Sequence, residues 1–556
     1  MVILYKVRLL LLLTLISLVN LNIYSQNENK LKAGVNNLLR YGNGKETSSG
    51  LSYNKEYFED LTDVKISTKD LSAGFRFEMN KPSELGRDFK GISKRYVEFT
   101  NHDNFDIRAG SFWEIIGRGL TLNSFEQRQL AFDTGLDGIR IIFKSALNKN
   151  KSIRFKSEII GGYLEYSDYL KPERIEKYDL KDANLELTFF SLLDFGFNYV
   201  YAKGKIPSGI YETDINAHLP EIYFSFNTSK FQLFSSYAHK RTEISANDLF
   251  PVSFTSMGDG LYSSVNYSIK NIGISLEYKN YRFDLTTPDN QSTERPTKAL
   301  PFQNPPAAVK QQTTVLTSRV PHPTDFNDEV GFQLDVFYMP GEDLSISLNG
   351  SIASRHYSFY DADTSSIVRF STNKRNLNFL PSLKNDFSPY SEISIESEYY
   401  YSDKLSGKLG FYYQHSITYN DFFKDSPDKK HYITMPIEAR YNLNNKISLK
   451  LHVESQWAYN SLREAKYQNF SNYFTSFFIT RSPDLAFSIS GEYTTDKLEL
   501  SGKNAWLEAE ASWNINSSNI ITIAFGSERG GLRCTSGICR YINPFNGFRL
   551  TIQNIF

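Results

Sequence analysis

Hydrophobic and polar residues alternate with a period of two along most of the chain from about residue 60 onward. In residues 446–459, the apolar Ile447, Leu449 and Leu451 are separated by polar residues, and residues 404–419 follow the same pattern. Because successive side chains of a strand point to opposite faces, the alternation predicts strands with one apolar and one polar face. Strands of ~10 or more residues exceed the ~5–6 usual in globular sheets and match the ~9–11 of tilted transmembrane strands.

The predicted strands are joined alternately by short turns and by longer polar connections. Eleven short turns rich in turn-forming residues centre near 68–70, 101–104, 147–151, 191–194, 227–230, 270–271, 340–343, 402–404, 442–446, 481–484 and 516–519. Longer polar stretches include 202–218, 240–258, 355–390 and 420–430. Short turns at one end and long loops at the other are typical of outer-membrane barrels, whereas a soluble sandwich has no reason to sort its loops by length.

Counting strands sharpens this prediction. Eleven hairpins, a first strand near 35–42 and a last strand at 547–556 predict an all-β, transmembrane antiparallel β-barrel of about 24 strands (range about 20–26) with inward-folding loops. The number is even, as in single-chain bacterial barrels, and it places both termini at the short-turn end. The last strand is amphipathic and ends on Phe556, which resembles the signal recognised by the outer-membrane assembly machinery, so this machinery is an expected partner.

The amino terminus has the three parts of a secretory signal. Lys6 and Arg8 precede a mainly apolar core over residues 9–19, and a more polar stretch ends at the small residue Ser25. The core is too short to span a bilayer, which favours cleavage after Ser25. The sequence therefore predicts a signal peptide over 1–25 and a single barrel domain over 26–556, located in the bacterial outer membrane.

Composition narrows the function classes. The chain of 556 residues has 62 Lys and Arg against 62 Asp and Glu, so it offers no basic surface for nucleic acid. No apolar run reaches the ~18 residues of a spanning helix. The 36 Tyr and 42 Phe fit the aromatic girdles of a barrel in contact with membrane lipid, although ordinary strand packing also favours them.

Residues 113–140 depart from the alternation and form an irregular charged segment, centred on 114–137. Opposed charges on a segment that folds into the lumen could select solutes by sign, and the alternative is an ion-paired loop that seals the barrel. The predicted constriction residues are Glu114, Arg118, Glu126, Arg128, Asp133, Asp137 and Arg140.

Residues 285–328 form a second irregular stretch, a long loop with seven Pro. Long strandless loops are usually functional or disordered, so both an ordered cover over the lumen and a free outer loop are open. Because wide barrels leave an aqueous channel unless something fills them, both irregular segments are candidates to fill this one.

Chemical motifs are few. Cys534 and Cys539 are the only cysteines, and in an oxidising compartment a loop-closing disulfide is favoured over a metal site, which would need more ligands. The sequence has no G-x-S-x-G, H-E-x-x-H or phosphate-binding Gly loop, and its eight His are scattered, so neither an enzyme nor a cofactor is expected.

Several short motifs resemble an uncharacterised family of large outer-membrane barrel proteins from Bacteroidetes-type bacteria. They are Gly117–Arg128, Leu136–Gly138, Asn304–Pro306, Asn327–Phe332 and Arg529–Cys534. The resemblance would cover nearly the whole mature chain and implies the barrel fold and location, but no assigned activity.

The sequence as a whole predicts an outer-membrane channel or transport component with a loop-constricted lumen. The alternatives are a non-conducting scaffold or partner barrel of an unnamed envelope or secretion complex, or a surface adhesin. A soluble secreted β protein is the third possibility.

Overall fold

The computed structural model describes residues 31–556 except 49, 102–103, 168–173, 209–210, 249–250, 252, 284–299, 360–369, 375–378, 419–426 and 536–537. The predicted signal peptide and the first part of the Pro-rich loop therefore lie outside the described residues. None of the helices among the described residues is long and apolar enough to cross a membrane.

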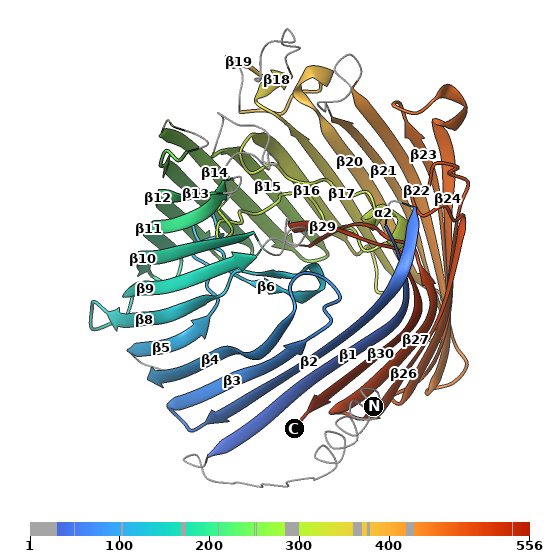
Figure 1. The fold of residues 1–556 in the computed structure, drawn as a ribbon, viewed down its shortest axis with the longest axis horizontal. Helices are drawn as coiled ribbons and strands as arrows, with labels where there is room; N and C mark the ends of the chain where they lie inside the picture. Colours follow the sequence, from blue (N-terminus) through green and yellow to red (C-terminus); the bar gives the residue numbers. More distant parts are fainter. Residues whose placement is uncertain are drawn as a thin grey trace.

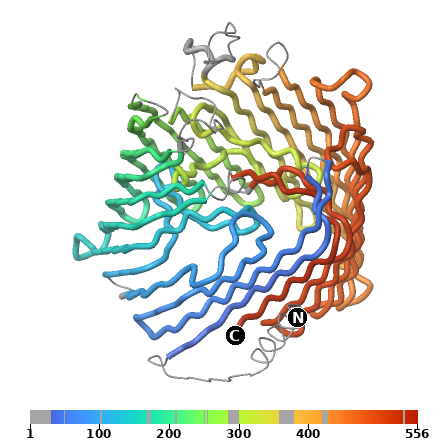
Figure 2. Tube along the Cα trace, in the orientation of Figure 1, coloured from blue at the N-terminus to red at the C-terminus, as the bar shows by residue number. Residues whose placement is uncertain are grey.

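Twenty-four antiparallel strands form one closed sheet (Figure 1). Each strand pairs with the next strand of the ring, and the last, β30, pairs with the first, β1, from Glu46–Phe545 to Asn36–Ile555. Figure 2 shows the two ends of the sheet lying side by side. The predicted all-β closed barrel and its strand number are confirmed.

The ring strands are β1 (Lys32–Ser48), β2 (Leu51–Ser67), β3 (Leu71–Asn80), β4 (Phe89–Asn101), β5 (Phe105–Phe112), β8 (Leu136–Ala146), β9 (Ile153–Ser167), β10 (Ile175–Phe189), β11 (Leu193–Ser208), β12 (Tyr211–Asn227), β13 (Phe231–Ile244), β14 (Phe254–Ile269), β15 (Ile272–Arg282), β16 (Glu329–Tyr338), β17 (Leu344–Ser354), β20 (Tyr390–Tyr400), β21 (Leu405–Thr418), β22 (Asp428–Asn442), β23 (Ile447–Asn460), β24 (Asn469–Arg481), β25 (Leu485–Thr494), β26 (Ala505–Asn516), β27 (Asn519–Glu528) and β30 (Phe545–Ile555).

Smaller elements lie in the connections. They are the strand pairs β6 (Glu126–Gln127) with β7 (Phe132–Asp133), β18 (Tyr357–Phe359) with β19 (Phe370–Lys374) and β28 (Gly531–Thr535) with β29 (Ile538–Ile542), the one-turn helix α2 (Val315–Ser318), and the 3-10 turns η1 (Arg128–Leu130), η2 (Asn385–Phe387) and η3 (Ala465–Tyr467). Figure 1 shows β6, β29 and α2 within the ring of strands.

All eleven predicted turns join neighbouring strands, so the predicted hairpins are confirmed. The predicted loop over 202–218 is wrong. There β11 and β12 continue as paired strands to Ser208 and Tyr211, and β1 and β2 likewise pair up to Ser48 and Leu51. Two of the connections at the long-loop end are therefore tight.

The sheet exchanges its apolar and polar faces part-way along β10. On the outer face Lys177, Asp179 and Lys181 give way to Ala183, Leu185 and Leu187, while on the inner face Tyr178 and Leu180 give way to Asp182, Asn184 and Glu186. The neighbouring β11 changes in the same way, from Phe195, Phe197 and Tyr199 on the outer face to Lys203 and Lys205. The part of the sheet nearer the short turns thus presents an apolar exterior and a polar interior. The part nearer the long loops has the ordinary arrangement of a soluble sheet, with an apolar interior.

Candidate functional site

Three connections enter the barrel and contact the inner face of its wall. They are residues 113–135 between β5 and β8, the described residues 300–328 between β15 and β16, and the described residues 529–535 and 538–544 between β27 and β30. The name lumen segments is used below for these three stretches.

Apolar contacts anchor the first two lumen segments to the upper, apolar part of the inner face. Phe302 is fully buried and packs edge-on against Tyr178 of β10, with ring centroids 5.5 Å apart. Ile116 and Leu122 belong to the same buried cluster, which also includes Val200 of β11. Since burying a large apolar side chain contributes ~1.5–3 kcal/mol, this cluster holds the segments more firmly than their polar contacts do.

Polar contacts tie the first two segments to each other. Asn123 Nδ2 donates to the carbonyl of Asn304 at 2.7 Å, and Asn304 Nδ2 donates to the carbonyl of Asn123 at 2.9 Å. Gln303 Nε2 donates to the carbonyl of Leu120 at 2.8 Å. At Gly119 the backbone has φ +84°, and an added Cβ would lie 2.7 Å from Asn123 and 3.0 Å from the Asn304 carbonyl oxygen, so this approach requires a glycine.

The second segment reaches the opposite side of the ring through α2. The backbone amides of Val315 and Leu316 both donate to the carboxylate of Glu454 on β23, each at 2.7 Å. Arg319, just after α2, donates to Glu492 of β25 at 2.5 Å and to the carbonyls of Arg529 and Gly530 at 2.7 Å. The second segment therefore also holds the third.

The predicted constriction residues are largely paired with one another and with the wall. Arg128 contacts Glu59 at 2.5 Å, Glu78 at 3.0 Å and Glu126 at 2.8 Å. Although burial acts to lower it, Glu59 and Glu78 raise the pKa of Arg128. Arg140 contacts Glu114 at 2.6 Å.

Asp133 contacts Lys94 at 2.5 Å and accepts from Trp113 Nε1 at 2.9 Å. Burial acts to raise the pKa of Asp133, but Lys94 and the hydrogen bonds from Trp113 and the Gly135 amide together lower it, so the net shift is downward. Asp133 is therefore a paired anion rather than a free charge that meets solutes.

Arg118 and Asp137 differ from the rest of the predicted set. Arg118 is exposed at the tip of the first segment, with its guanidinium 5.2 Å from the Phe234 ring centroid, in a cavity of about 320 Å³ shared with Glu186. The prediction is wrong for Asp137, which does not face the lumen. Alternation along β8 places Asp137 with Ile139 on the outer face, where it lies 3.6 Å from Arg95.

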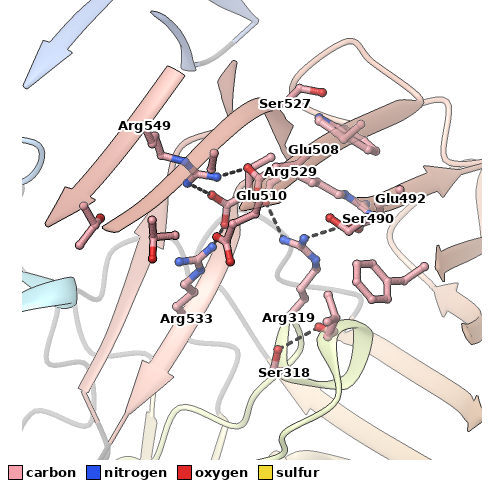
Figure 3. Close-up of a pocket in the computed structure, with 18 of the residues that line it drawn as sticks. Ser318, Arg319, Ser490, Glu492, Glu508, Glu510, Ser527, Arg529, Arg533 and Arg549 are labelled. Carbon is pink, nitrogen blue, oxygen red and sulfur yellow. Dashed lines mark hydrogen bonds and ion pairs between the residues drawn. The ribbon is translucent and has the colours of Figure 1, made fainter. Parts of the chain in front are cut away.

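A charged cavity of about 530 Å³ lies between the second and third segments and the wall (Figure 3). Its charged lining residues are Arg40, Arg319, Arg529, Arg533 and Arg549 together with Glu492, Glu508, Glu510 and Glu528. Trp506 lies beneath Arg529, whose guanidinium is 5.0 Å from the Trp506 ring centroid. Burial lowers the pKa of Arg319, and burial followed by the charges of Arg319 and Arg549 lowers the pKa of Arg533.

Sequence reasoning missed these residues as a site. Glu454 and Glu492 fall on polar faces of strands, where an ordinary solvated residue gives the same pattern. The only signal in the sequence was that Arg529 and Gly530 belong to one of the motifs that resemble the uncharacterised barrel family. Cys534 and Cys539 are joined by a disulfide across the β28–β29 hairpin of the third segment. No group of three or more His, Cys, Asp or Glu that could hold a metal ion occurs among the described residues.

A family model described as "Family of unknown function (DUF6029)" matches residues 4–556. No curated protein matches the chain. Solved structures that are similar include the copper transporter OprC, with 10% identity, a TM-score of 0.41 and coverage of 95% of this chain and 81% of that one. The FrpB iron transporter from Neisseria meningitidis has 11% identity, a TM-score of 0.41 and coverage of 95% and 83%.

The siderophore receptor PirA from Pseudomonas aeruginosa has 7% identity, a TM-score of 0.44 and coverage of 96% of this chain and 81% of that one. At TM-scores below 0.5, this likeness neither defines the lumen of the present chain nor transfers a function to it.

Proposed function

The chain belongs to a family of unknown function (DUF6029), and from the geometry of its barrel we propose that it is an outer-membrane transport barrel that passes small polar solutes through a lumen narrowed by three loops. One observation carries the proposal: a closed ring of strands is apolar outside over one band, while charged side chains and cavities lie inside the same ring. The predicted bacterial outer-membrane location is part of this proposal, as is the Bacteroidetes-type origin.

The outer band has the dimensions that a membrane requires. On β11 it runs over residues 193–201, which matches the ~9–11 residues with which a tilted strand crosses a bilayer. Exposed Tyr163, Tyr199 and Tyr237 lie close to where charged outer residues begin, as aromatic girdles do at the membrane surface. We place the membrane at this band and the soluble-type part of the sheet outside it, at the long-loop end.

The lumen segments suit a gate better than a permanent seal. Their contacts with β23 and β25 are hydrogen bonds and ion pairs to carboxylates, which water can replace at moderate cost. The first segment and the start of the second, at Leu300 and Phe302, are held by a larger apolar cluster and form the fixed part. In this proposal the part of the second segment around α2 and the third segment move, and the charged cavity between them and the wall is the passage.

Two measurements test the proposal. Membrane fractions of expressing cells are extracted with carbonate and then with detergent, and release by carbonate alone would remove the membrane assignment. The purified protein is then reconstituted in planar bilayers, as wild type and as R319A, which removes the contacts of Arg319 to Glu492 and to the third segment.

We expect small conductance steps for wild type and larger or more frequent ones for R319A, with R241A, an exposed outer-face arginine paired to Glu243, unchanged. If neither wild type nor R319A conducts ions, although both are correctly folded, a non-conducting scaffold or an adhesin would be favoured.

The carboxyl-terminal strand has its own expected role. β30 closes the ring against β1, and the chain ends at Phe556, one residue beyond it. We propose that this strand is the part recognised by the outer-membrane assembly machinery. Removal of Phe556 should reduce the amount of barrel in the membrane without changing the conductance of molecules that do assemble.

A further inference from the structure

The charged cavity carries positive charge on the side of the lumen segments and mainly negative charge on the strands of the wall. Arg319 and Arg533 belong to the second and third segments, whereas Glu492, Glu508 and Glu510 belong to β25 and β26. Figure 3 shows Arg319 and Arg533 extending from the segments toward these carboxylates.

Most of these charges already neutralise one another. Arg319 pairs with Glu492 at 2.5 Å, Arg533 pairs with Glu528, and Arg549 pairs with both Glu508 and Glu528. Glu510 is exposed to the cavity and has no ion pair within the described part of the chain. Arg533 has only one carboxylate partner there and lies close enough to Arg319 and Arg549 for their charges to act on it.

This pairing discriminates between solutes by charge. A solute with only a carboxylate can take an arginine from its glutamate, but it leaves that glutamate without a partner in a partly buried site. A solute with only an ammonium group can contact the unpaired Glu510, but contact with Glu508 takes one of the two partners of Arg549. Loss of a charged partner in a partly buried site is costly in either case. A solute with both charges can replace both halves of a pair, so no charge is left alone.

We propose that this cavity binds a small zwitterionic solute, such as a short peptide with free termini, whose carboxylate contacts Arg319 and Arg533 and whose ammonium group contacts Glu508 and Glu510. The proposal names the solute class of the passage and in that sense rests on the proposed function. The volume of about 530 Å³ lies within the ~300–1,000 Å³ of small-molecule sites. Trp506 and Phe474 add apolar surface for the body of the solute.

Binding to the purified full-length protein in detergent, at low ionic strength, tests the inference by calorimetry. Four probes differ only in their ends: triglycine, N-acetyl-triglycine, triglycinamide and N-acetyl-triglycinamide. We expect triglycine to bind at least tenfold more tightly than either singly charged probe, and the doubly blocked probe to bind most weakly. R533Q and E510Q should each weaken triglycine binding at least tenfold, while R241Q on the outer face leaves it unchanged.

Each other outcome overturns the inference. Equal binding of triglycine and N-acetyl-triglycine makes the cavity a plain anion site, and equal binding of triglycinamide makes it a cation site. If none of the four probes gives binding heat, although circular dichroism shows the protein to be folded as a β-sheet, the cavity has no such ligand.

A liposome-swelling assay separates this inference from the proposed function. Triglycine binding without swelling would keep the site and remove transport. Swelling without binding would keep transport and remove the site.

Discussion

Arg540 of the third lumen segment donates from Nη2 to Tyr166 Oη of β9 at 3.0 Å, across a sequence separation of 374 residues. The third segment connects β27 to β30, and six strands of the ring (β1, β2, β3, β4, β5 and β8) lie between β30 and β9. The contact therefore crosses the interior of the barrel rather than following its wall. The same guanidinium lies 5.9 Å from the ring centroid of Phe132 in the first segment. Each of the three lumen segments therefore contacts the other two.

Substitution of Arg540 should release the β28–β29 hairpin from β9 and from the first segment. We expect R540A to fold normally and to give larger or longer-lived openings in planar bilayers, because the hairpin loses both its hydrogen bond to Tyr166 and its contact with Phe132. R154A is a matched control, since the hydrogen bond of Arg154 among the described residues goes to Ser191 at a short turn. Equal conductance for R540A and wild type would mean that the contacts of Arg540 do not restrict the passage.

The disulfide should protect the same hairpin without supporting the barrel. Cys534 and Cys539 face each other across β28 and β29, and trypsin can cut after Arg533 and Arg540 at either side. Closing a short loop restricts only that loop in the open state, so reduction should expose these two bonds and leave the strands intact. Trypsin treatment with and without reductant, read by mass spectrometry, checks this. Cleavage at equal rates under both conditions would contradict it.

Phe302 should be the main anchor of the second segment. It is fully buried against Tyr178, and truncation of a buried Phe to Ala typically costs ~3–5 kcal/mol. F302A should therefore raise hydrogen exchange over residues 300–328 while the strands stay protected. F190A, at a turn where the side chain is 68% exposed, should change neither. Uniform loss of protection in F302A would show instead that the segment and the barrel fold as one unit.

Sequence alone predicted the barrel because its signals are local. The alternation of residues 446–459 and each of the eleven turns can be recognised within a dozen residues, and all of them are confirmed. The error at 202–218 has a physical cause. Lys203, Lys205, Glu212 and Asp214 face outward beyond the apolar band, so polar side chains there are typical of a strand in water and suggested a loop.

The lumen contacts could not be predicted in this way. The amides of Val315 and Leu316 meet Glu454 across 139 and 138 residues, and nothing near either sequence position indicates the other. Yet the short motifs that resemble the uncharacterised barrel family mark the right segments. Residues 117–128, 304–306 and 529–534 are the places where the three lumen segments meet. Departure from alternation located the first two segments, a motif of the family resemblance marked the third, and only the structure supplied their partners.

The second segment should be pH-sensitive at Asp325. Burial, only partly opposed by Arg355 at 3.6 Å, raises the pKa of Asp325 to about 6. Because the folded pKa lies above the unfolded value of 3.8, this stabilisation is complete below about pH 4 and is lost as the pH rises through about 6. At ~1.4 kcal/mol per unit, the full effect is about 3 kcal/mol.

Native-state hydrogen exchange over residues 320–328 at pH 4.5 and pH 7.5 measures this effect. Wild type should be better protected at pH 4.5, after correction for intrinsic rates. D325N keeps an acceptor for the Asn327 amide and removes the charge, so it should be protected at pH 7.5 as wild type is at pH 4.5. If D325N retains the full pH dependence, Asp325 is not the titrating group.

The position of the membrane on the outer face gives the sharpest test of the barrel as a membrane protein. Leu185 and Lys181 lie on the same face of β10, four residues apart, on either side of the exchange of faces. Leu185 is 48% exposed and lies inside the apolar band, where an added Arg should cost up to ~2–4 kcal/mol, depending on its depth in the bilayer. L185R should therefore reduce the amount of assembled barrel in membrane fractions and lower the urea concentration at which the barrel unfolds in lipid.

Position 181 lies outside the band, so K181R and K181L should both assemble like wild type. A comparable loss in K181L and L185R would place the membrane boundary elsewhere on β10. Unchanged assembly and stability in L185R would mean that this face does not contact lipid at all.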